Sequence, residues 1–175
     1  MTDRKAVKPM AVMGGIIVAG IAVDQATKAL AISRLKPGEP ISILSDVFQL
    51  QLLRNPGAAF STGTSMTVVF SILALVVLIA VSVWVVPKVR SVIWAVPVGM
   101  GMAGVAGNFI DRLIRAPGPF RGYVIDFFAL KHFAVFNVAD ILLTCAALLI
   151  AFDVFVLRVD SKGGRPSRAD LSETR

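Results

Sequence analysis

Two carboxylates held in one poorly solvated site could catalyse hydrolysis, and the stretch from Gly107 to Asp140 carries three aspartates beside long apolar runs. Close carboxylates cannot both ionise easily, so they share a proton. One can then take a proton from water while the other donates a hydrogen bond to a carbonyl oxygen. Such a pair needs neither a metal nor a nucleophilic side chain. Because ionisable side chains are costly in a bilayer, these acids are functional candidates.

The three aspartates differ in their neighbours. Asp111 has Arg112 beside it and Arg115 one helical turn further on, so ion pairing is expected to keep its carboxylate charged. The expected role of Asp111 is therefore structural. Asp126 has apolar neighbours and no adjacent basic residue, so its pKa is expected to rise. These neighbours favour Asp126 over Asp111 as one member of a catalytic pair.

Asp140 is the other candidate member. It follows Asn137 by three residues at the expected start of a helix, which resembles a capping box and favours the charged carboxylate. We hypothesise that Asp126 holds the shared proton and that Asp140 is ionised. Simple helix capping by Asn137 and Asp140 is an alternative that this spacing leaves open.

Composition indicates a membrane protein. The 175 residues are 56% hydrophobic and 17% charged, with a mean hydropathy of +0.78, whereas soluble domains contain about 25% charged residues. The net charge of +7 comes mainly from short tails and turns, a placement that favours membrane topology over nucleic-acid binding. A single cysteine, Cys145, and a single histidine, His132, predict neither a disulfide framework nor a His-rich metal site. No metal or other cofactor is expected.

Four apolar segments are long enough to cross about 30 Å of hydrocarbon. They predict an all-α polytopic membrane protein, one domain over residues 1–157, with transmembrane helices at 10–32, 66–86, 92–114 and 137–157. Longer loops are expected at 33–65 and 115–136. In the first loop, Phe48, Leu50 and Leu52 alternate with glutamines, which predicts a small β-element outside the bilayer. The segment around Asp126 is expected to be irregular, and the polar tail 158–175 to be disordered.

Basic residues are densest in the N-terminal head, the turn after the second span and the C-terminal tail, which predicts cytoplasmic termini. Four antiparallel spans then bring distant polar residues to the outer membrane face. The residues expected to converge there are Asp24, Asn55, Asn108, Arg112, Asp126, Asn137 and Asp140. Asp24 and Lys28 are four residues apart and are expected to form an ion pair. The spacing of Gly99, Ala103 and Gly107 predicts close helix packing.

Five short motifs follow one another along the chain. They are Asp24-x-x-x-Lys28, Asn55-Pro-Gly-Ala-Ala-Phe60, Gly107-Asn-Phe-Ile-Asp-Arg112, Val124-Ile-Asp-Phe127 and Phe136-Asn-Val-Ala-Asp140. Together they resemble the ordered motif set of the lipoprotein signal peptidases, the signal peptidase II family. The resemblance covers all four predicted spans. Each motif alone is weak, but five in this order with this hydropathy are highly specific.

This resemblance implies a bacterial inner-membrane aspartyl endopeptidase with four transmembrane helices, an extracytoplasmic β-cradle and an active site near the outer face. It implies substrates that are diacylglyceryl-modified prolipoproteins, cut just before the lipidated cysteine. Membrane lipids and peptide antibiotics of the globomycin type are the other expected partners, and nucleic acid is not.

By the same resemblance, Asp126 and Asp140 are the catalytic pair. The residues expected to line the substrate site are Asn55, Gly57, Ala58, Gly104, Asn108, Arg112 and Asn137. Ala58 and Gly104 are expected to leave space for small substrate residues. Asp24 and Lys28 match a supporting pair, and Asp111 is expected to support the structure as well.

Two other functions compete with this one. A proton- or ion-coupled membrane carrier could use intramembrane acids as a relay, but it predicts acids spread across the membrane depth, and here they gather at one end. A non-enzymatic assembly factor could use polar residues to hold helices together. That function predicts that changing the aspartates to asparagine leaves activity intact.

Overall fold

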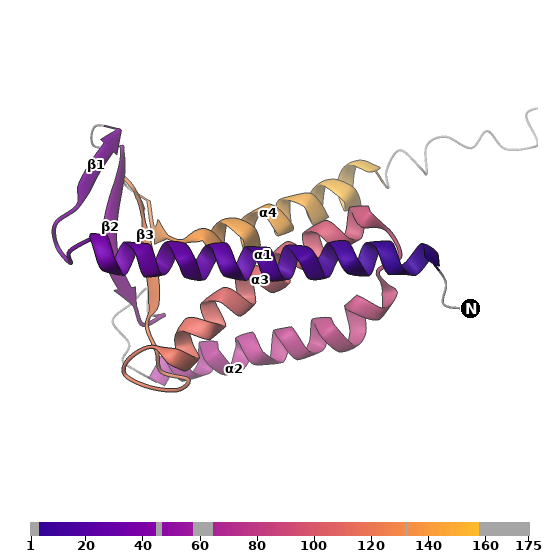
Figure 1. Cartoon of the computed structure of the whole chain (residues 1–175), viewed down its shortest axis with the longest axis horizontal. Helices are drawn as coiled ribbons and strands as arrows, with labels where there is room; N and C mark the ends of the chain where they lie inside the picture. The colour runs from indigo at the N-terminus through magenta and orange to yellow at the C-terminus, as the bar shows by residue number, and fades with distance from the viewer. Residues whose placement is uncertain (1–3, 45–46, 58–64, 132, 158–175) are drawn as a thin grey trace, which may run out of the picture.

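Four helices and a small sheet make up the computed structural model, which describes residues 4–44, 47–57, 65–131 and 133–157 (Figure 1). The helices are α1 Arg4–Arg34, α2 Ser65–Ala80, α3 Val92–Ile114 and α4 Val138–Phe152. α2 continues through a π-helical turn at Val81–Val85 and a 3₁₀ turn at Val86–Lys88, and α4 continues through a π-helical turn at Asp153–Leu157. Ala58, His132 and the tail 158–175 lie outside the described residues.

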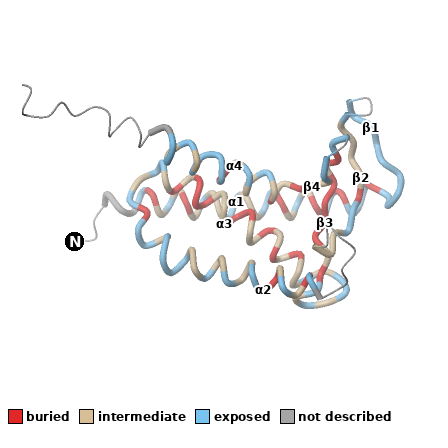
Figure 2. The backbone as a smooth tube through the Cα atoms, turned by 180° about the vertical axis from the view of Figure 1, so that it is seen from behind, coloured by how far each residue is buried: buried red, intermediate tan, exposed pale blue. Residues whose placement is uncertain are grey.

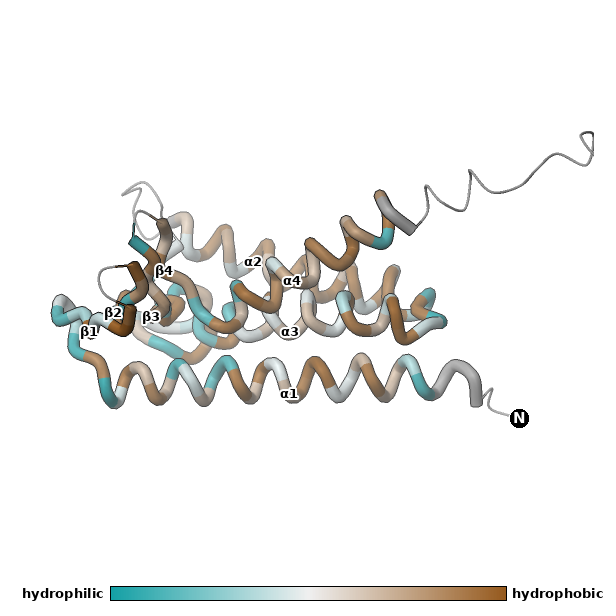
Figure 3. Tube along the Cα trace, turned by 90° about the horizontal axis from the view of Figure 1, so that it is seen from above, coloured by the Kyte–Doolittle hydropathy of each residue, from teal (hydrophilic) through white to brown (hydrophobic). Residues whose placement is uncertain are grey.

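The helical segments confirm the predicted polytopic membrane fold. Four of them are long and apolar enough to cross a membrane: Lys8–Arg34, Met66–Lys88, Val92–Ile114 and Val138–Phe155. Apolar residues dominate α2 and α4 along most of their length (Figure 3). The helices run along the long axis of the molecule, and the sheet lies across one end of the bundle (Figure 1). This end is called the sheet end below.

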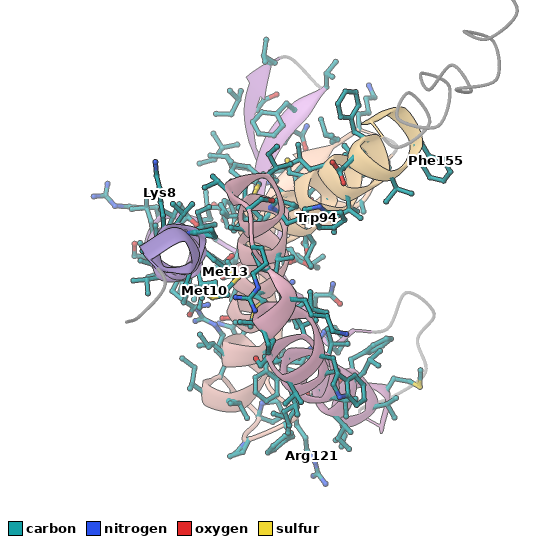
Figure 4. All side chains as sticks on the ribbon, turned by 90° about the vertical axis from the view of Figure 1, so that its right-hand side faces the viewer. Lys8, Met10, Met13, Trp94, Arg121 and Phe155 are labelled. Atoms are coloured by element: carbon teal, nitrogen blue, oxygen red, sulfur yellow. The ribbon has the colours of Figure 1, made fainter. Side chains whose placement is uncertain are left out.

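α3 is the central helix, and α1, α2 and α4 all contact it (Figure 4). Its small residues face α1, as their spacing predicts. A Cβ added to Gly99 would lie 3.1 Å from the Met13 carbonyl oxygen, and one added to Gly107 would lie 2.5 Å from Asp24 Oδ2. Ala103 is fully buried on the same stripe. Small residues therefore let the two helices approach closely.

Gly104 faces α4, where no space remains for a side chain. A Cβ at this position would lie 2.5 Å from the Ala139 carbonyl oxygen and 2.7 Å from Leu143 Cγ. We expect Gly104→Ala to lower the free energy of unfolding by about 1–3 kcal/mol, because α3 and α4 must move apart. Gly14→Ala in α1 is the control, since nothing lies within 4 Å of its added Cβ. Unfolding in detergent measures both variants, and equal stabilities would contradict this packing.

The sheet is antiparallel, and its strands pair in sequence order. They are β1 Ile41–Leu44, β2 Phe48–Asn55, β3 Val124–Leu130 and β4 Val135–Phe136. The alternation at residues 48–52 thus predicts β2 correctly.

The expectation of an irregular segment around Asp126 is wrong, because this segment is the inner strand β3. Leu53 of β2 pairs with Asp126, and Asn55 pairs with Val124. Residues 124–127 are all buried. A strand that is covered on both faces lacks the alternation of apolar and polar residues by which β2 is recognised.

An apolar cluster joins the sheet to the helices. It consists of Ala31 and Leu35 from α1, Leu52 from β2, and Ile125 and Phe127 from β3. Buried positions concentrate where β3 meets the helix ends (Figure 2). This packing holds Asp126 against the sheet end of the bundle.

Candidate active site

A buried charge cluster links α1 to α3 at the sheet end. Lys28 Nζ lies 2.9 Å from Asp24 Oδ2 and 2.9 Å from Asp111 Oδ2, and all three side chains are 0% exposed. Asp24 Oδ1 also accepts a hydrogen bond from the Ala139 backbone N–H of α4 at 3.0 Å. The cluster therefore holds three helices together around one lysine.

Asp111 pairs with Arg115, as its neighbours predict, but Arg112 is not among its partners and Lys28 is. Its Oδ1 lies 2.6 Å from Arg115 Nε, and its Oδ2 accepts a hydrogen bond from the Ile125 backbone N–H at 3.2 Å. Lys28 is the second cation, at 2.9 Å. The adjacent Arg112 lies against the Phe70 ring of α2 instead. Both oxygens of Asp111 are thus held by cations and a backbone N–H, and none of these groups is a second carboxyl group.

Asp126 lies on β3 between two asparagines. Its Oδ2 accepts a hydrogen bond from Asn55 Nδ2 at 2.8 Å, and its Oδ1 accepts one from Asn137 Nδ2 at 2.5 Å. Asn55 ends β2 and Asn137 precedes α4, so three elements meet at this carboxyl group.

Asp140 lies in the first turn of α4 and is held by Asn137 and Asn108. The Asn137 backbone N–H donates to Asp140 Oδ2 at 3.1 Å, and Asn108 Nδ2 donates to Asp140 Oδ1 at 2.8 Å. The Asp140 backbone N–H donates in return to Asn137 Oδ1 at 3.1 Å, which completes a capping box. Asn137 also binds Asp126, so the residue that caps α4 contacts both carboxyl groups.

Asn108 connects the charge cluster to this pair. Its Oδ1 accepts hydrogen bonds from Lys28 Nζ at 2.9 Å and from Asn137 Nδ2 at 3.2 Å. Two donors on Oδ1 fix the amide so that Nδ2 faces Asp140. Lys28 therefore orients a residue that binds a candidate catalytic carboxylate.

Burial raises the pKa of Asp126 to about 6, and the nearby charge of Asp140 adds to the rise. Hydrogen bonds from Asn55 and Asn137 and the charge of Lys28 act in the opposite direction. The rise is the direction that the apolar neighbours of Asp126 predict. A raised pKa favours Asp126 as the residue that holds the hypothesised proton.

The turn after β2 fixes the Asn55 amide. The Gly57 backbone N–H donates to Asn55 Oδ1 at 2.8 Å, and Gly57 has a φ of 85°, which favours glycine. The buried Thr67 hydroxyl at the start of α2 donates to the Pro56 carbonyl oxygen. Asn55 Nδ2 is thereby left facing Asp126.

A pocket of about 430 Å³ opens beside Asn55. It is lined by Leu53, Asn55, Gly57, Phe70, Arg112, Ala134 and Val135. Arg112 Nη1 is buried and has no hydrogen-bond partner within the described part of the chain. A buried donor without an acceptor is costly, so this pocket suits a ligand that brings a carbonyl or another acceptor.

Most of the predicted site residues meet at the sheet end. These are Asn55, Asn108, Asp126, Asn137 and Asp140, with Gly57 and Arg112 beside the adjoining pocket. The expectation that Gly104 leaves space for substrate is wrong, because the Ala139 carbonyl and Leu143 of α4 fill that space. Ala58 lies outside the described residues.

The sequence does not predict two residues that support the site, Gln25 and Thr67. Gln25 Nε2 lies 3.1 Å from Asp24 Oδ2, 3.1 Å from the Gly107 carbonyl oxygen and 3.3 Å from Asp111 Oδ1. Thr67 supports the Asn55 turn. The sequence signals for these two residues are a glutamine next to Asp24 and a hydroxyl in the first turn of a mostly apolar helix.

Comparison with known proteins identifies the family of this chain. The family model described as signal peptidase (SPase) II matches residues 16–156. The lipoprotein signal peptidase of Mycobacterium avium is 41% identical over 153 residues, which cover 87% of this chain and 83% of the relative. The lipoprotein signal peptidase of Streptomyces coelicolor is 38% identical over 141 residues, which cover 81% of this chain and 69% of the relative.

A solved structure has the same fold. It is described as a bacterial membrane enzyme and superposes with a TM-score of 0.74 at 26% identity, covering 83% of this chain and 94% of that one. The family model extends over all four membrane-spanning helices and both strands that carry site residues. The chain therefore belongs to the signal peptidase II family.

Proposed function

We propose that this aspartic endopeptidase of the signal peptidase II family removes signal peptides from prolipoproteins, with Asp126 and Asp140 as its catalytic pair. One observation carries the assignment of the pair. Asn137 donates from its side chain to Asp126 at 2.5 Å and from its backbone to Asp140 at 3.1 Å. A single residue thus holds two carboxyl groups from different elements in one partly buried site.

The proposed reaction needs one proton shared by the pair. The ionised carboxylate takes a proton from water, and the water oxygen attacks the carbonyl carbon of the scissile peptide bond. The protonated carboxyl donates its proton to the carbonyl oxygen, which stabilises the developing charge. When the carbon–nitrogen bond breaks, the leaving amine takes up the proton that was removed from water, and one hydroxyl of the tetrahedral intermediate returns its proton to the other carboxylate, which restores the shared proton. Asp126 is the proposed holder of the shared proton, because burial raises its pKa.

The pocket beside Asn55 is the proposed site for the substrate backbone. Arg112 Nη1 offers a hydrogen-bond donor there. Gly57 lies close to both Arg112 and Phe70, so little space is left between these residues in the pocket wall. Asn108 and Asn137 are proposed to hold the carboxyl groups while substrate lies across them. The buried charge cluster of Asp24, Lys28 and Asp111 is proposed to hold these site residues in place.

The finer details of substrate and topology are also proposals. The substrates carry diacylglycerol on a cysteine, and the cut falls just before that residue. The termini are cytoplasmic, and the sheet end lies at the outer face of the bacterial inner membrane. Globomycin-type antibiotics bind the same site, and membrane lipids surround the helices. Residues 1–157 act as one membrane domain. The lysines and arginines that concentrate in the N-terminal head, the turn after α2 and the C-terminal tail support this orientation.

Cleavage of one prolipoprotein, supplied with and without its diacylglyceryl group, tests this function. The purified protein in detergent is expected to cut only the lipidated form, and mass spectrometry locates the new terminus at the lipidated cysteine. A cut at another bond, or equal cutting of both forms, would contradict the proposed specificity. The carrier alternative has no support, because Asp24, Asp126 and Asp140 all lie at one end of the bundle.

The pH dependence of kcat/KM should reflect the free pair. Loss of the shared proton above a pKa of about 6 removes the donor to the carbonyl, so kcat/KM is expected to fall as pH rises through this value. The hydrogen bond from Asn55 lowers the pKa of Asp126, so Asn55→Ala should move this fall to higher pH. Gln51→Ala on the same strand is the control and should leave it in place. A fall that moves to lower pH in Asn55→Ala would contradict the proposal.

A further inference from the structure

We propose that a second pocket, on the opposite face of β3 from the carboxyl pair, binds the headgroup of an anionic phospholipid. The pocket has a volume of about 310 Å³ and is lined by Ile32, Arg54, Ile114, Arg115, Ala116, Tyr123 and Ile125. Ile125 directly precedes Asp126, and successive side chains of a strand point to opposite faces. The pocket is therefore separate from the proposed catalytic site, and this inference does not depend on that site.

Two guanidinium groups give this pocket its chemistry. Arg115 uses Nε for its hydrogen bond to Asp111, which leaves its Nη groups available to a ligand. Lys28 and Arg115 together balance the charges of Asp24 and Asp111, and the described lining residues include no carboxylate to offset Arg54, so Arg54 brings the unbalanced positive charge. Guanidinium groups bind phosphate oxygens in a bidentate geometry, and the Tyr123 hydroxyl adds a neutral donor. The pocket thus suits a phosphate group.

The depth of the pocket favours a lipid over a free anion. The spans Lys8–Arg34 and Val92–Ile114 both end beside it, which puts Arg54 and Arg115 at the level of the headgroups. Ile32 is 37% exposed and Ile114 is 70% exposed, so apolar side chains lie on the bilayer side of the arginines. A phospholipid contacts both the arginines and the apolar side chains of this pocket, whereas inorganic phosphate contacts only the arginines. A zwitterionic lipid would bring an ammonium group close to two arginines, so an anionic headgroup fits best.

Native mass spectrometry of the full-length protein in detergent tests the site by titration with phosphatidylglycerol or phosphatidylcholine of the same acyl chains. Wild type is expected to bind phosphatidylglycerol more tightly. Arg54→Gln should weaken that binding on the order of 10-fold, because one charged hydrogen-bonding group is lost. Arg121→Gln is the matched control and should bind as wild type does, because Arg121 points away from the bundle (Figure 4). Excess inorganic phosphate should not displace the lipid.

Several results would overturn the proposal. Equal affinities for the two lipids would remove the role of headgroup charge, and displacement by inorganic phosphate would identify a free-anion site. A folded Arg54→Gln variant that keeps wild-type affinity would remove the site itself. If that variant does not fold, Arg54→Lys replaces it, since lysine keeps the charge but not the bidentate geometry. Wild-type phosphatidylglycerol affinity in Arg54→Lys would then contradict the assigned chemistry.

Discussion

Asp126→Asn and Asp140→Asn are each expected to lower kcat for prolipoprotein cleavage by about 10²–10⁴-fold, the range for loss of a general acid or base. Asparagine has nearly the same shape as aspartate but can neither take a proton from water nor give one to a carbonyl. Asn55 and Asn137 both donate to Asp126, so an amide there keeps one acceptor and turns its own NH₂ group toward a donor. The loss should therefore come with a modest loss of stability. Single-turnover cleavage of a lipidated substrate measures the rate, and thermal unfolding reports the folded fraction.

Asp153→Asn is the matched control for this pair. Asp153 begins the π-helical turn that follows α4, at the end of the helix opposite Asp140. The same chemical change there should leave the rate within about twofold of wild type, because Asp153 lies at the far end of α4 from both carboxyl groups. Near wild-type activity in a folded Asp126→Asn or Asp140→Asn variant would exclude that residue from the pair and favour a non-enzymatic role for it.

Lys28→Met is expected to lower the free energy of unfolding by about 3–5 kcal/mol, the cost of breaking a buried ion pair by removing one partner. Methionine fills a similar volume but leaves Asp24 without its cation and Asp111 with Arg115 alone. Both carboxylates are fully buried, so water cannot replace the lost charge. Reversible unfolding in detergent, followed by circular dichroism, measures the change.

Lys36→Met makes the same substitution in an exposed ion pair. Lys36 lies 3.6 Å from Glu39, and the two side chains are 78% and 69% exposed. Such pairs contribute less than about 1 kcal/mol, so this variant should unfold almost as wild type does. Similar losses in the two variants would show that the buried cluster has no special role. In the fraction of Lys28→Met that remains folded, kcat should also fall, because Asn108 loses the donor that orients it toward Asp140.

The helices and the capping box of α4 follow from the sequence because their signals are local. Long apolar runs predict the four spans, and three-residue spacing predicts the capping box at Asn137 and Asp140. The alternating direction of four successive spans then predicts which helix ends lie together, so Asn55, Asn108 and Asp126 are expected at one site, and the positive-inside pattern predicts its side of the membrane. The resemblance to the signal peptidase II motifs strengthened the choice of Asp126 over Asp111.

The predictions that the structure corrects depend on contacts between segments that are distant in the sequence. β3 is covered on both faces and lacks period-two alternation, so its strand character is hidden in the sequence. Gly104 looked like a space-forming residue, but only the structure shows that α4 occupies that space. The role of Lys28 is likewise larger than its spacing from Asp24 indicates, because its contacts with Asp111 and Asn108 join residues about 80 positions apart.

The measurement that tests the central claim most directly compares single-turnover rates of wild type, Asp126→Asn, Asp140→Asn and the double variant on one lipidated prolipoprotein. Residues that act as a unit show strongly non-additive losses. If Asp126 and Asp140 share one proton and activate one water, the double variant should be no slower than the slower single variant. Losses that multiply in the double variant would mean that the two carboxyl groups act independently, and would contradict a catalytic pair.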